Sequence, residues 1–216
     1  MPCARYAAVR NKWPMALVDS FDTLIFDYGG VLVTPQSEED QAAMAALVGI
    51  PVERFHDLYW ARRADYDSAG LTAEQYWQDI VGQAGMKLTD KKLEELINID
   101  TTSWMQFDDV MWQWLADLRK ARKRIAMLSN MPRELGVALK TQTDRLGAFD
   151  YVTLSYEVRV VKPDAAIYEH CLEGLDAKAE RTMFFDDRIE NVQAAEQLGM
   201  RGIQFLDRDH VLLQVR

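Results

Sequence analysis

The stretch LIFDYGGVLVT, residues 24–34, is unusual because a carboxylate ends a run of apolar residues and two glycines follow it. A short apolar run bounded by turn residues is typical of a buried strand in a parallel sheet. Asp27 would then stand at the carboxyl end of this strand, where open parallel sheets bind their ligands. Gly29 and Gly30 would let the backbone turn sharply and approach a ligand closely. The stretch therefore predicts a strand that ends in a binding site.

Beyond residue 107, short apolar runs alternate with longer amphipathic stretches. The short runs, which predict strands, are RIAML (124–128), YVTLS (151–155), TMFFDD (182–187) and GIQFL (202–206). The longer stretches, which predict helices, are 108–122, 133–147 ended by Gly147, 165–175, and 188–199 closed by Gly199. Strands of about five residues that alternate with helices of about twelve favour right-handed βαβ units. We therefore expect an α/β fold, with a Rossmann-like parallel sheet and helices on both of its faces.

Residues 38–106 have a different pattern, with helical spacing and no evident strand. Breaks are expected at Pro51, Gly70 and Gly85, where turn-forming residues interrupt the periodicity. One of the helices between these breaks is expected to cover VERFHDLYWARRADY, residues 52–66. The segment therefore predicts a bundle of about four helices inserted directly after the first strand.

Composition limits the classes of function. The 216-residue chain has a net charge of -9, which argues against non-specific nucleic-acid binding. It has no apolar run long enough to span a membrane, and its two cysteines, Cys3 and Cys171, do not suggest a disulfide framework. His56, His170 and His210 are too scattered to predict a zinc site or a histidine-centred triad. We expect a cytoplasmic protein with no nucleic-acid or membrane partner, and the oligomeric state is left open.

Several polar side chains follow the predicted strands or precede a predicted helix. They are Asp27, Ser129, Asn130, Lys162, Asp186 and Asp187. Carboxylates that are buried together need a compensating charge, and a hard cation with oxygen ligands such as Mg²⁺ supplies it. Asp27 can then attack a phosphorus atom while Ser129 and Lys162 bind the phosphate oxygens. The pattern indicates hydrolysis of a phosphate ester through an aspartyl phosphate.

These segments, in this order, resemble the motifs of the haloacid dehalogenase (HAD) superfamily of hydrolases, over about residues 21–205. The matching segments are LIFDYGGVL with Asp27, IAMLSN with Ser129, VKPDAAIYEHCL with Lys162, and FFDDRIENVQAAEQLGM with Asp186 and Asp187. The last of these is the most specific, because it joins an acidic pair to a characteristic helix start. The resemblance implies that the helical insert is a small cap that closes over the site and selects the substrate.

The resemblance also implies site roles and a domain division. Mg²⁺ would be held by Asp27, the backbone carbonyl of Gly29 and Asp187, with Asp186 nearby. Phosphate or substrate would be bound by Ser129, Asn130, Lys162 and Gly30, and the catalytic residues would be Asp27 and Lys162. The chain would divide into an N-terminal leader (1–19), a core domain (20–37 and 107–216) and a helical cap domain (38–106). The D-x-G-G-V branch of the family implies a small phosphorylated metabolite, of sugar-phosphate type, as the substrate.

The chain departs from the family pattern at Gly29. Most phosphatases of this family carry a second aspartate there, which protonates the leaving group and later activates water. General acid–base catalysis contributes roughly 10² to 10⁴ in rate, so this position bears directly on function. Two alternatives to the phosphatase therefore stay open. One is a dehalogenase in which Asp27 attacks carbon, and the other is a catalytically impaired module that binds a phosphoryl ligand.

Aromatic and basic residues in the stretch LYWARRADYDSAGLTAEQYW, residues 58–77, are candidates for substrate recognition. Trp60 can stack on a ring and Arg63 can bind an anion. The alternative interpretation is that the aromatic residues form the core of the helical bundle and the arginines are solvated.

Overall fold

The computed structural model of the chain describes residues 18–214, with side chains described as far as residue 211. Five strands form one parallel sheet in the order β3-β2-β1-β4-β5. Their bounds are β1 Thr23–Phe26, β2 Arg124–Ser129, β3 Tyr151–Leu154, β4 Thr182–Asp186 and β5 Arg201–Gln204. The central strand β1 pairs with β2 on one side and β4 on the other, which confirms the predicted α/β, Rossmann-like sheet.

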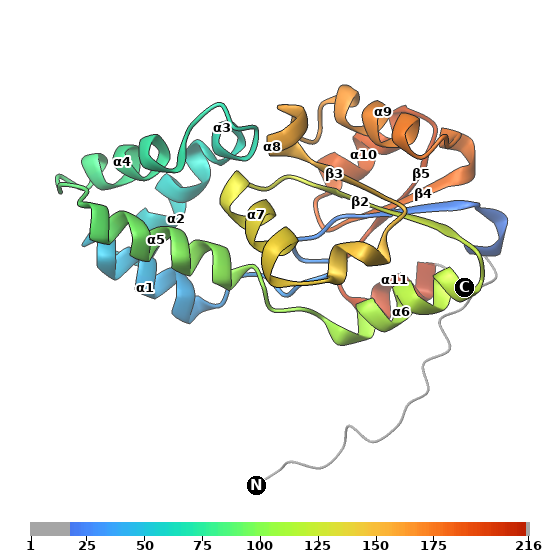
Figure 1. Cartoon of the computed structure of the whole chain (residues 1–216), viewed down its shortest axis with the longest axis horizontal. Coiled ribbons are helices and arrows are strands. Elements are labelled where there is room, and N and C mark those ends of the chain that lie inside the picture. The colour runs from blue at the N-terminus through green and yellow to red at the C-terminus, as the bar shows by residue number, and fades with distance from the viewer. Residues whose placement is uncertain (1–17, 215–216) are drawn as a thin grey trace, which may run out of the picture.

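Helices cover both faces of the sheet (Figure 1). One face packs against α6 (Asp109–Lys120), α7 (Arg133–Gln142) and α11 (Arg208–Gln214), and the other against α9 (Ala165–Gly174) and α10 (Ile189–Gln197). Side chains of β1 alternate between these layers: Phe26 meets Trp114 of α6, whereas Ile25 joins the cluster of α9. Because both faces are buried, every residue of β1 is apolar or a buried threonine.

The first five of the six helices that lie between β1 and β2 in the chain form a separate lobe beside the sheet (Figure 1). They are α1 Glu38–Val48, α2 Val52–Ala61, α3 Arg63–Asp67, α4 Ala73–Gln83 and α5 Asp90–Ser103. Their apolar residues form a cluster of their own around Trp77, Tyr76 and Phe55, distinct from the two clusters that line the sheet. The predicted helical insert is therefore present in the fold.

The helix expected over residues 52–66 is divided in two, which corrects that prediction. Its break is at Arg62, whose backbone leaves the helical region at φ −127° and ψ 22°. The Arg62 guanidinium pairs with Asp65 and with Asp79 of α4. The long helices α1, α2, α4 and α5 make up the four-helix bundle, and α3 is a short additional helix.

The prediction of a helix over residues 133–147 is wrong about where the helix ends, because α7 stops at Gln142. Thr143 takes an extended conformation; its hydroxyl donates to the Leu139 carbonyl (3.0 Å) and accepts from the Arg145 N–H (3.3 Å). Gly199, by contrast, follows α10 with φ +90°, as expected of a helix-ending glycine.

The remaining elements are short and were not predicted. They are the 3₁₀ helices η1 (Val18–Ser20), η2 (Arg145–Ala148) and η3 (Ala179–Arg181), and the four-residue helix α8 (Ser155–Val158). The predicted leader, residues 1–19, lies outside the described residues except for its last two. Cys3 lies outside them as well, whereas Cys171 is a buried free thiol on α9.

The two chain segments that connect the insert to the sheet run side by side. Val33 and Phe107 form an antiparallel bridge. The Thr34 N–H donates to the Gln106 carbonyl (2.9 Å), and the Asp108 N–H donates to the Leu32 carbonyl (3.0 Å). The chain therefore enters and leaves the insert at one place, next to the turn that follows β1.

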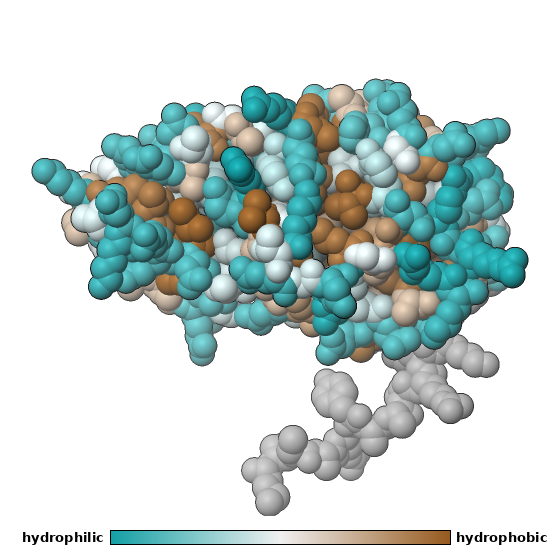
Figure 2. Space-filling model, viewed as in Figure 1, coloured by the Kyte–Doolittle hydropathy of each residue, from teal (hydrophilic) through white to brown (hydrophobic). Residues whose placement is uncertain are grey.

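The face of the molecule shown in Figure 2 is mostly hydrophilic. Figure 2 shows hydrophilic residues over most of the viewed face, with small, separate hydrophobic patches over both lobes. The large exposed apolar side chains, such as Trp60 and Leu206, are spread over different elements. Within residues 18–214 there is no helix that combines the length and the apolar character needed to cross a bilayer.

Candidate active site

The residues expected at the strand ends meet at the carboxyl edge of β1, β2 and β4. Asp27 follows β1 directly, and its N–H donates to the Phe185 carbonyl of β4 (2.8 Å). Ser129 ends β2 on the other side of β1, and Asp186 ends β4. Because β1 lies between these two strands, side chains from segments about 100 and 160 residues apart are brought to one place.

Lys162 connects two of the carboxylates. Its ammonium lies 2.8 Å from Asp27 Oδ1 and 2.6 Å from Asp186 Oδ2, and it donates to the Leu128 carbonyl at 3.0 Å. The lysine is only 4% exposed and Asp186 is fully buried. Burial by itself would lower the pKa of Lys162, but Asp186 and Asp27 raise that pKa above its usual value. The lysine therefore remains a cation at neutral pH and fixes the position of Asp27.

Asn130 positions Lys162 through the lysine's main chain. Its Oδ1 accepts from the Lys162 N–H (2.8 Å), and its Nδ2 donates to the Lys162 carbonyl (2.9 Å). Both ends of the Asn130 amide are therefore used within the protein. The expected contact of Asn130 with phosphate stays a prediction, and the sequence carried no signal for the contact with Lys162 beyond the position of Asn130 after β2.

Asp186 is held from several sides as well. Its Oδ1 accepts from the Arg188 N–H (2.9 Å) and from Asn191 Nδ2 (2.9 Å), while its Oδ2 faces Lys162. With both oxygens bonded, this carboxylate acts chiefly to hold the lysine. Sequence reasoning missed Asn191, although it lies in the same acidic motif, five residues after Asp186 and on the buried side of α10.

The carboxylates of Asp27, Asp186 and Asp187 form a compact group, since each offers an oxygen within 4.8 Å of the others. Burial raises the pKa of Asp27 to about 8, against the opposing effect of Lys162 and with support from Asp186. Partial desolvation and the neighbouring Asp186 raise the pKa of Asp187, which lies at the exposed side of the group, to about 6. Three acidic groups face a single ammonium, so a further positive charge is needed to keep all of them ionised.

The glycine turn leaves room beside this group. Gly30 has φ +71°, and a Cβ at this position would lie 2.9 Å from Asp187 Oδ2. Any side chain at this position would occupy the space next to the carboxylate. An all-oxygen donor set with no side chain on the adjacent Gly30 suits a hard divalent cation that keeps water ligands, so these residues fit Mg²⁺.

Ser129 is buried at the end of β2, next to the strand that carries Asp27. Its hydroxyl makes only a long contact, 3.4 Å, to the Asn130 carbonyl, as far as the described residues show. A hydroxyl that is placed at this edge and weakly bonded within the protein is available to donate to a ligand.

Gly29 is covered by Trp104, the residue that directly follows α5. A Cβ on Gly29 would lie 3.2 Å from Cζ3 of that indole. The indole Nε1 donates to the Tyr59 hydroxyl (3.3 Å), and the Trp104 carbonyl accepts from the Tyr28 hydroxyl (2.7 Å). A tryptophan that is held from two sides therefore lies where the side chain of an acid at position 29 would start.

We expect Gly29→Asp to give no gain in catalysis and to lower the free energy of unfolding by about 1–3 kcal/mol, because the new side chain overpacks against Trp104. The double variant Gly29→Asp with Trp104→Ala removes the clash and should be more stable than the sum of the two single changes predicts. Urea unfolding of the four proteins measures this coupling. Strict additivity of the two changes would show that the indole does not restrict position 29.

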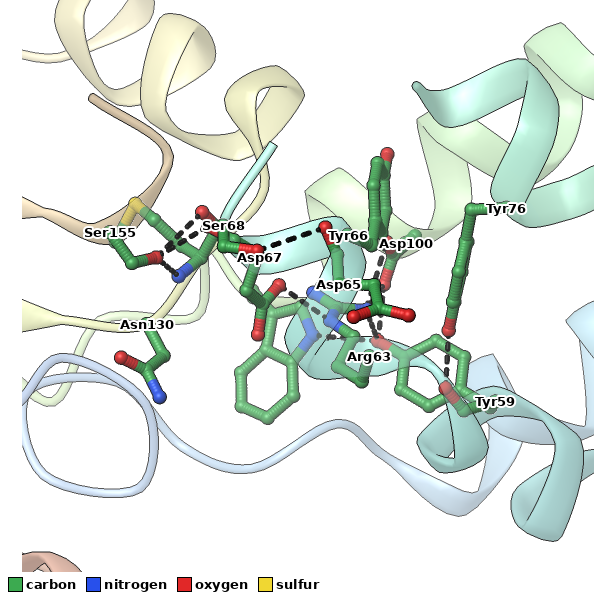
Figure 3. A network of polar contacts seen from close by, with 12 residues as sticks. Tyr59, Arg63, Asp65, Tyr66, Asp67, Ser68, Tyr76, Asp100, Asn130 and Ser155 are labelled. Atoms are coloured by element: carbon green, nitrogen blue, oxygen red, sulfur yellow. Dashed lines mark hydrogen bonds and ion pairs between the residues drawn. The ribbon is translucent and has the colours of Figure 1, made fainter. Parts of the chain in front are cut away.

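The two predicted cap contacts lie in different environments. Trp60 is 42% exposed on α2, with its ring against Tyr59, and its contact with substrate stays a prediction. Arg63 is 6% exposed, and Figure 3 shows its guanidinium bonded inside the insert. It bonds to Asp67 (2.8 Å), Asp100 (3.2 Å) and the Tyr59 hydroxyl. Arg63 is therefore engaged within the insert, in contrast to the free anion-binding group expected from the sequence.

With this geometry established, comparison with known proteins identifies the family. The model of the haloacid dehalogenase-like hydrolases matches residues 21–199, which is most of the chain. The chain belongs to the haloacid dehalogenase-like hydrolases. The four motifs recognised in the sequence lie within the matched range, and their acidic residues are the ones that the fold brings together.

Individual relatives of this hydrolase include phosphatases. It is 26% identical over 197 residues to a sesquiterpene phosphatase of Aspergillus oryzae, covering 91% of this chain and 96% of that protein. It is 24% identical to a drimenol cyclase of Aspergillus calidoustus, covering 89% of this chain but only 35% of the cyclase. Its fold is similar to that of a HAD family enzyme from Bacteroides thetaiotaomicron, solved as an Asp-to-Ala mutant with magnesium and inorganic phosphate. That likeness has a TM-score of 0.69 and 20% identity, and it covers 88% of this chain and 98% of the other.

Proposed function

We propose that this hydrolase is a Mg²⁺-dependent phosphatase that cleaves a small organic monophosphate through an aspartyl-phosphate intermediate. The observation that carries the proposal is the group of three carboxylates around the buried ammonium of Lys162. Such a group is costly to assemble unless the protein uses its charge, and a divalent cation with a phosphate is the partner that fits it. The names of the phosphatase relatives support the same reaction class.

We propose that Asp27, the Gly29 carbonyl and Asp187 bind the metal. Asp186 lies within reach, but both of its oxygens are already bonded, so its part is to hold Lys162. When bound, Mg²⁺ supplies the positive charge that lets these carboxylates and a phosphate dianion share the site.

In the proposed reaction, a carboxylate oxygen of Asp27 attacks phosphorus and the ester oxygen leaves. Lys162 orients the nucleophile through its 2.8 Å contact with Asp27 Oδ1 and adds positive charge beside the transferring group. The Ser129 hydroxyl and the Gly30 N–H donate to the phosphate oxygens. Water then hydrolyses the aspartyl phosphate and restores Asp27.

The substrate class and the cellular setting belong to the same proposal. The motif pattern favours a sugar-type phosphate, while one relative is named as a sesquiterpene phosphatase, so we propose both classes as candidate substrates. We propose residues 38–106 as a cap domain on residues 20–37 and 107–216, because the insert has its own apolar cluster and enters and leaves at one point. A cytoplasmic location is supported by the free thiol of Cys171.

We expect phosphate release from 4-nitrophenyl phosphate, and from glucose 1-phosphate or farnesyl phosphate, only when Mg²⁺ is present. The reason is that the carboxylate group repels a phosphate dianion until its charge is offset. Phosphate release is measured with Mg²⁺ and with excess chelator, and the preferred substrate has the highest kcat/KM. Equal rates in the chelator would contradict the metal requirement. Halide release from a 2-haloacid in chelator would favour the dehalogenase, and thermal stabilisation by inorganic phosphate without turnover would favour the impaired module.

A further inference from the structure

A glycine at position 29 leaves the turn after β1 with no side chain that can protonate a leaving group. The reaction proposed above still releases an alkoxide or phenoxide, so a proton donor on another element is needed for poor leaving groups. Building on the proposed phosphatase function, we propose that Asp67, at the end of α3 in the helical insert, is the general acid and base of the site.

Asp67 is fixed directly above the carboxyl edge of β2 and β3. Its carbonyl accepts a hydrogen bond of 2.6 Å from the Ser155 hydroxyl, at the end of β3. The same hydroxyl accepts from the Met131 N–H (2.9 Å), in the loop that follows Ser129 and begins with Asn130. A second contact supports this docking, because Tyr66 donates to Glu134 at the start of α7 (2.9 Å). The end of α3 is therefore attached to the loop that follows β2.

The carboxyl group of Asp67 also lies within electrostatic reach of β4's loop. Arg188, directly after the Asp186–Asp187 pair, is close enough to lower the pKa of Asp67. In the sheet, β1 lies between β2 and β4. The proposal therefore places the Asp67 side chain over the end of β1, where Asp27 stands, because its backbone is attached to the β2 loop and its charge interacts with Arg188 in the loop after β4.

The Asp67 side chain is held in place by one hydrogen-bonding partner, and its hydrogen-bonding capacity is not fully used. Figure 3 shows Asp67 between Ser155, which its main chain bonds, and Arg63, which its carboxylate bonds. Arg63 Nε donates to Oδ1 at 2.8 Å, whereas Oδ2 has no hydrogen-bond partner among the residues that the structure describes. The side chain is 9% exposed, and under the proposal this second oxygen meets the ligand.

Asp67 shares one guanidinium with a second acid. Arg63 faces both Asp67 and Asp100, and all three are buried, so one positive charge meets two carboxylates. Asp100 is well satisfied, because its Oδ1 also accepts from the Tyr59 hydroxyl (2.5 Å) and from Gln36 (3.2 Å). Burial raises the pKa of Asp67 to about 6, Arg63 opposes this, Asp100 adds to it and Arg188 opposes it. Asp67 can therefore hold and release a proton near neutral pH, as a general acid and base must.

Hydrolysis takes two steps, and Asp67 moves one proton in each. Asp27 forms a bond to phosphorus while the ester P–O bond breaks, and the departing oxygen keeps the electron pair and takes the proton from Asp67. In the second step, Asp67 takes a proton from water as the water oxygen bonds to phosphorus. The bond between phosphorus and Asp27 then breaks, which returns Asp27 as a carboxylate and Asp67 as the protonated acid.

Substrates that differ only in their leaving group test this role. We expect Asp67→Asn to lower kcat/KM about 100-fold or more for phenyl phosphate, whose leaving group needs a proton. The leaving group of 2,4-dinitrophenyl phosphate needs no proton, so the rate of the first step with this substrate should fall less than about tenfold. The aspartyl phosphate should then accumulate, because the general base of the second step is missing. The alkaline limb of the pH–kcat/KM profile for phenyl phosphate should also disappear. Asparagine keeps the oxygen that accepts from Arg63, so the cluster should remain folded.

Asp100→Asn is the matched control, because it removes the other carboxylate that pairs with Arg63. Because Asp100 raises the pKa of Asp67, the control is measured at a pH well below 6, where Asp67 is protonated in both proteins, and there its effect should be the same for both substrates. Asp67→Glu keeps an acid, so its kcat/KM for phenyl phosphate should lie above that of Asp67→Asn. It replaces the asparagine variant if that variant does not fold. Equal losses on both substrates in Asp67→Asn would overturn the acid role and leave a structural one. Wild-type protein that releases phosphate from neither substrate would overturn the proposed phosphatase function itself.

Discussion

Asp27→Asn is expected to abolish phosphate release, with a loss of at least about 10⁴-fold in kcat, because the amide cannot form the aspartyl phosphate on which turnover depends. Asparagine keeps the shape of the side chain and an oxygen that accepts from the Tyr28 N–H, which lies 2.7 Å from Asp27 Oδ1. Lys162 keeps its second carboxylate, Asp186, at 2.6 Å. The fold should therefore survive, and steady-state phosphate release with Mg²⁺ measures the chemical loss directly.

The matched control is Asp22→Asn, at the opposite end of the same strand. Asp22 pairs with Arg181 in a solvent-exposed salt bridge (side chain 55% exposed), far from the carboxylate group. Its replacement should leave kcat within a factor of about two, since exposed pairs contribute little. If Asp27→Asn turned over substrate at a rate near that of Asp22→Asn, the nucleophile would have to be another residue.

Lys162→Met is expected to lower the free energy of unfolding by about 3–5 kcal/mol in metal-free protein, because it leaves buried carboxylates without their cation. Asp27 and Asp186 would then lie buried without the ammonium between them, and the exposed Asp187 has an oxygen within 4.8 Å of an oxygen of each. Phosphatase activity should be lost together with stability, since the same ammonium orients Asp27. Urea unfolding monitored by circular dichroism measures the first effect.

Arg181→Met provides the comparison, because it removes a cation of similar length from an exposed pair. We expect a cost of less than about 1 kcal/mol for this change. Mg²⁺ should restore more stability to Lys162→Met than to wild type, as the metal replaces the missing charge. A loss in Lys162→Met no larger than in Arg181→Met would show that the lysine does not hold the carboxylates together.

Much of the fold was predictable because it depends on local patterns. The apolar run before Asp27 is buried on both faces of the sheet, and such runs mark strands of a parallel sheet without any knowledge of their partners. The end of α7 was not predictable in this way, since it depends on the Thr143 hydroxyl bonding back to the Leu139 carbonyl. The division at Arg62 depends in part on Asp79, a residue of another helix.

The site was predictable to the extent that strand ends share one edge of a sheet. This rule placed Asp27, Ser129 and the acidic pair together, and the fold brings them there. The partners of these residues were not predictable, because Asn130 bonds the main chain of Lys162 across 32 residues of sequence. Contacts of that kind are set by packing, and no spacing in the sequence encodes them.

The paired connections between the sheet and the helical lobe have a consequence for how such a chain can change over generations. Thr34 and Gln106 are hydrogen-bonded neighbours, although 71 residues separate them in the chain. A shorter, longer or unrelated segment can join these two points and leave the five strands in register. Evolution can therefore replace the inserted helices, and with them the range of molecules that reach the site, while the sheet and its carboxylates stay unchanged.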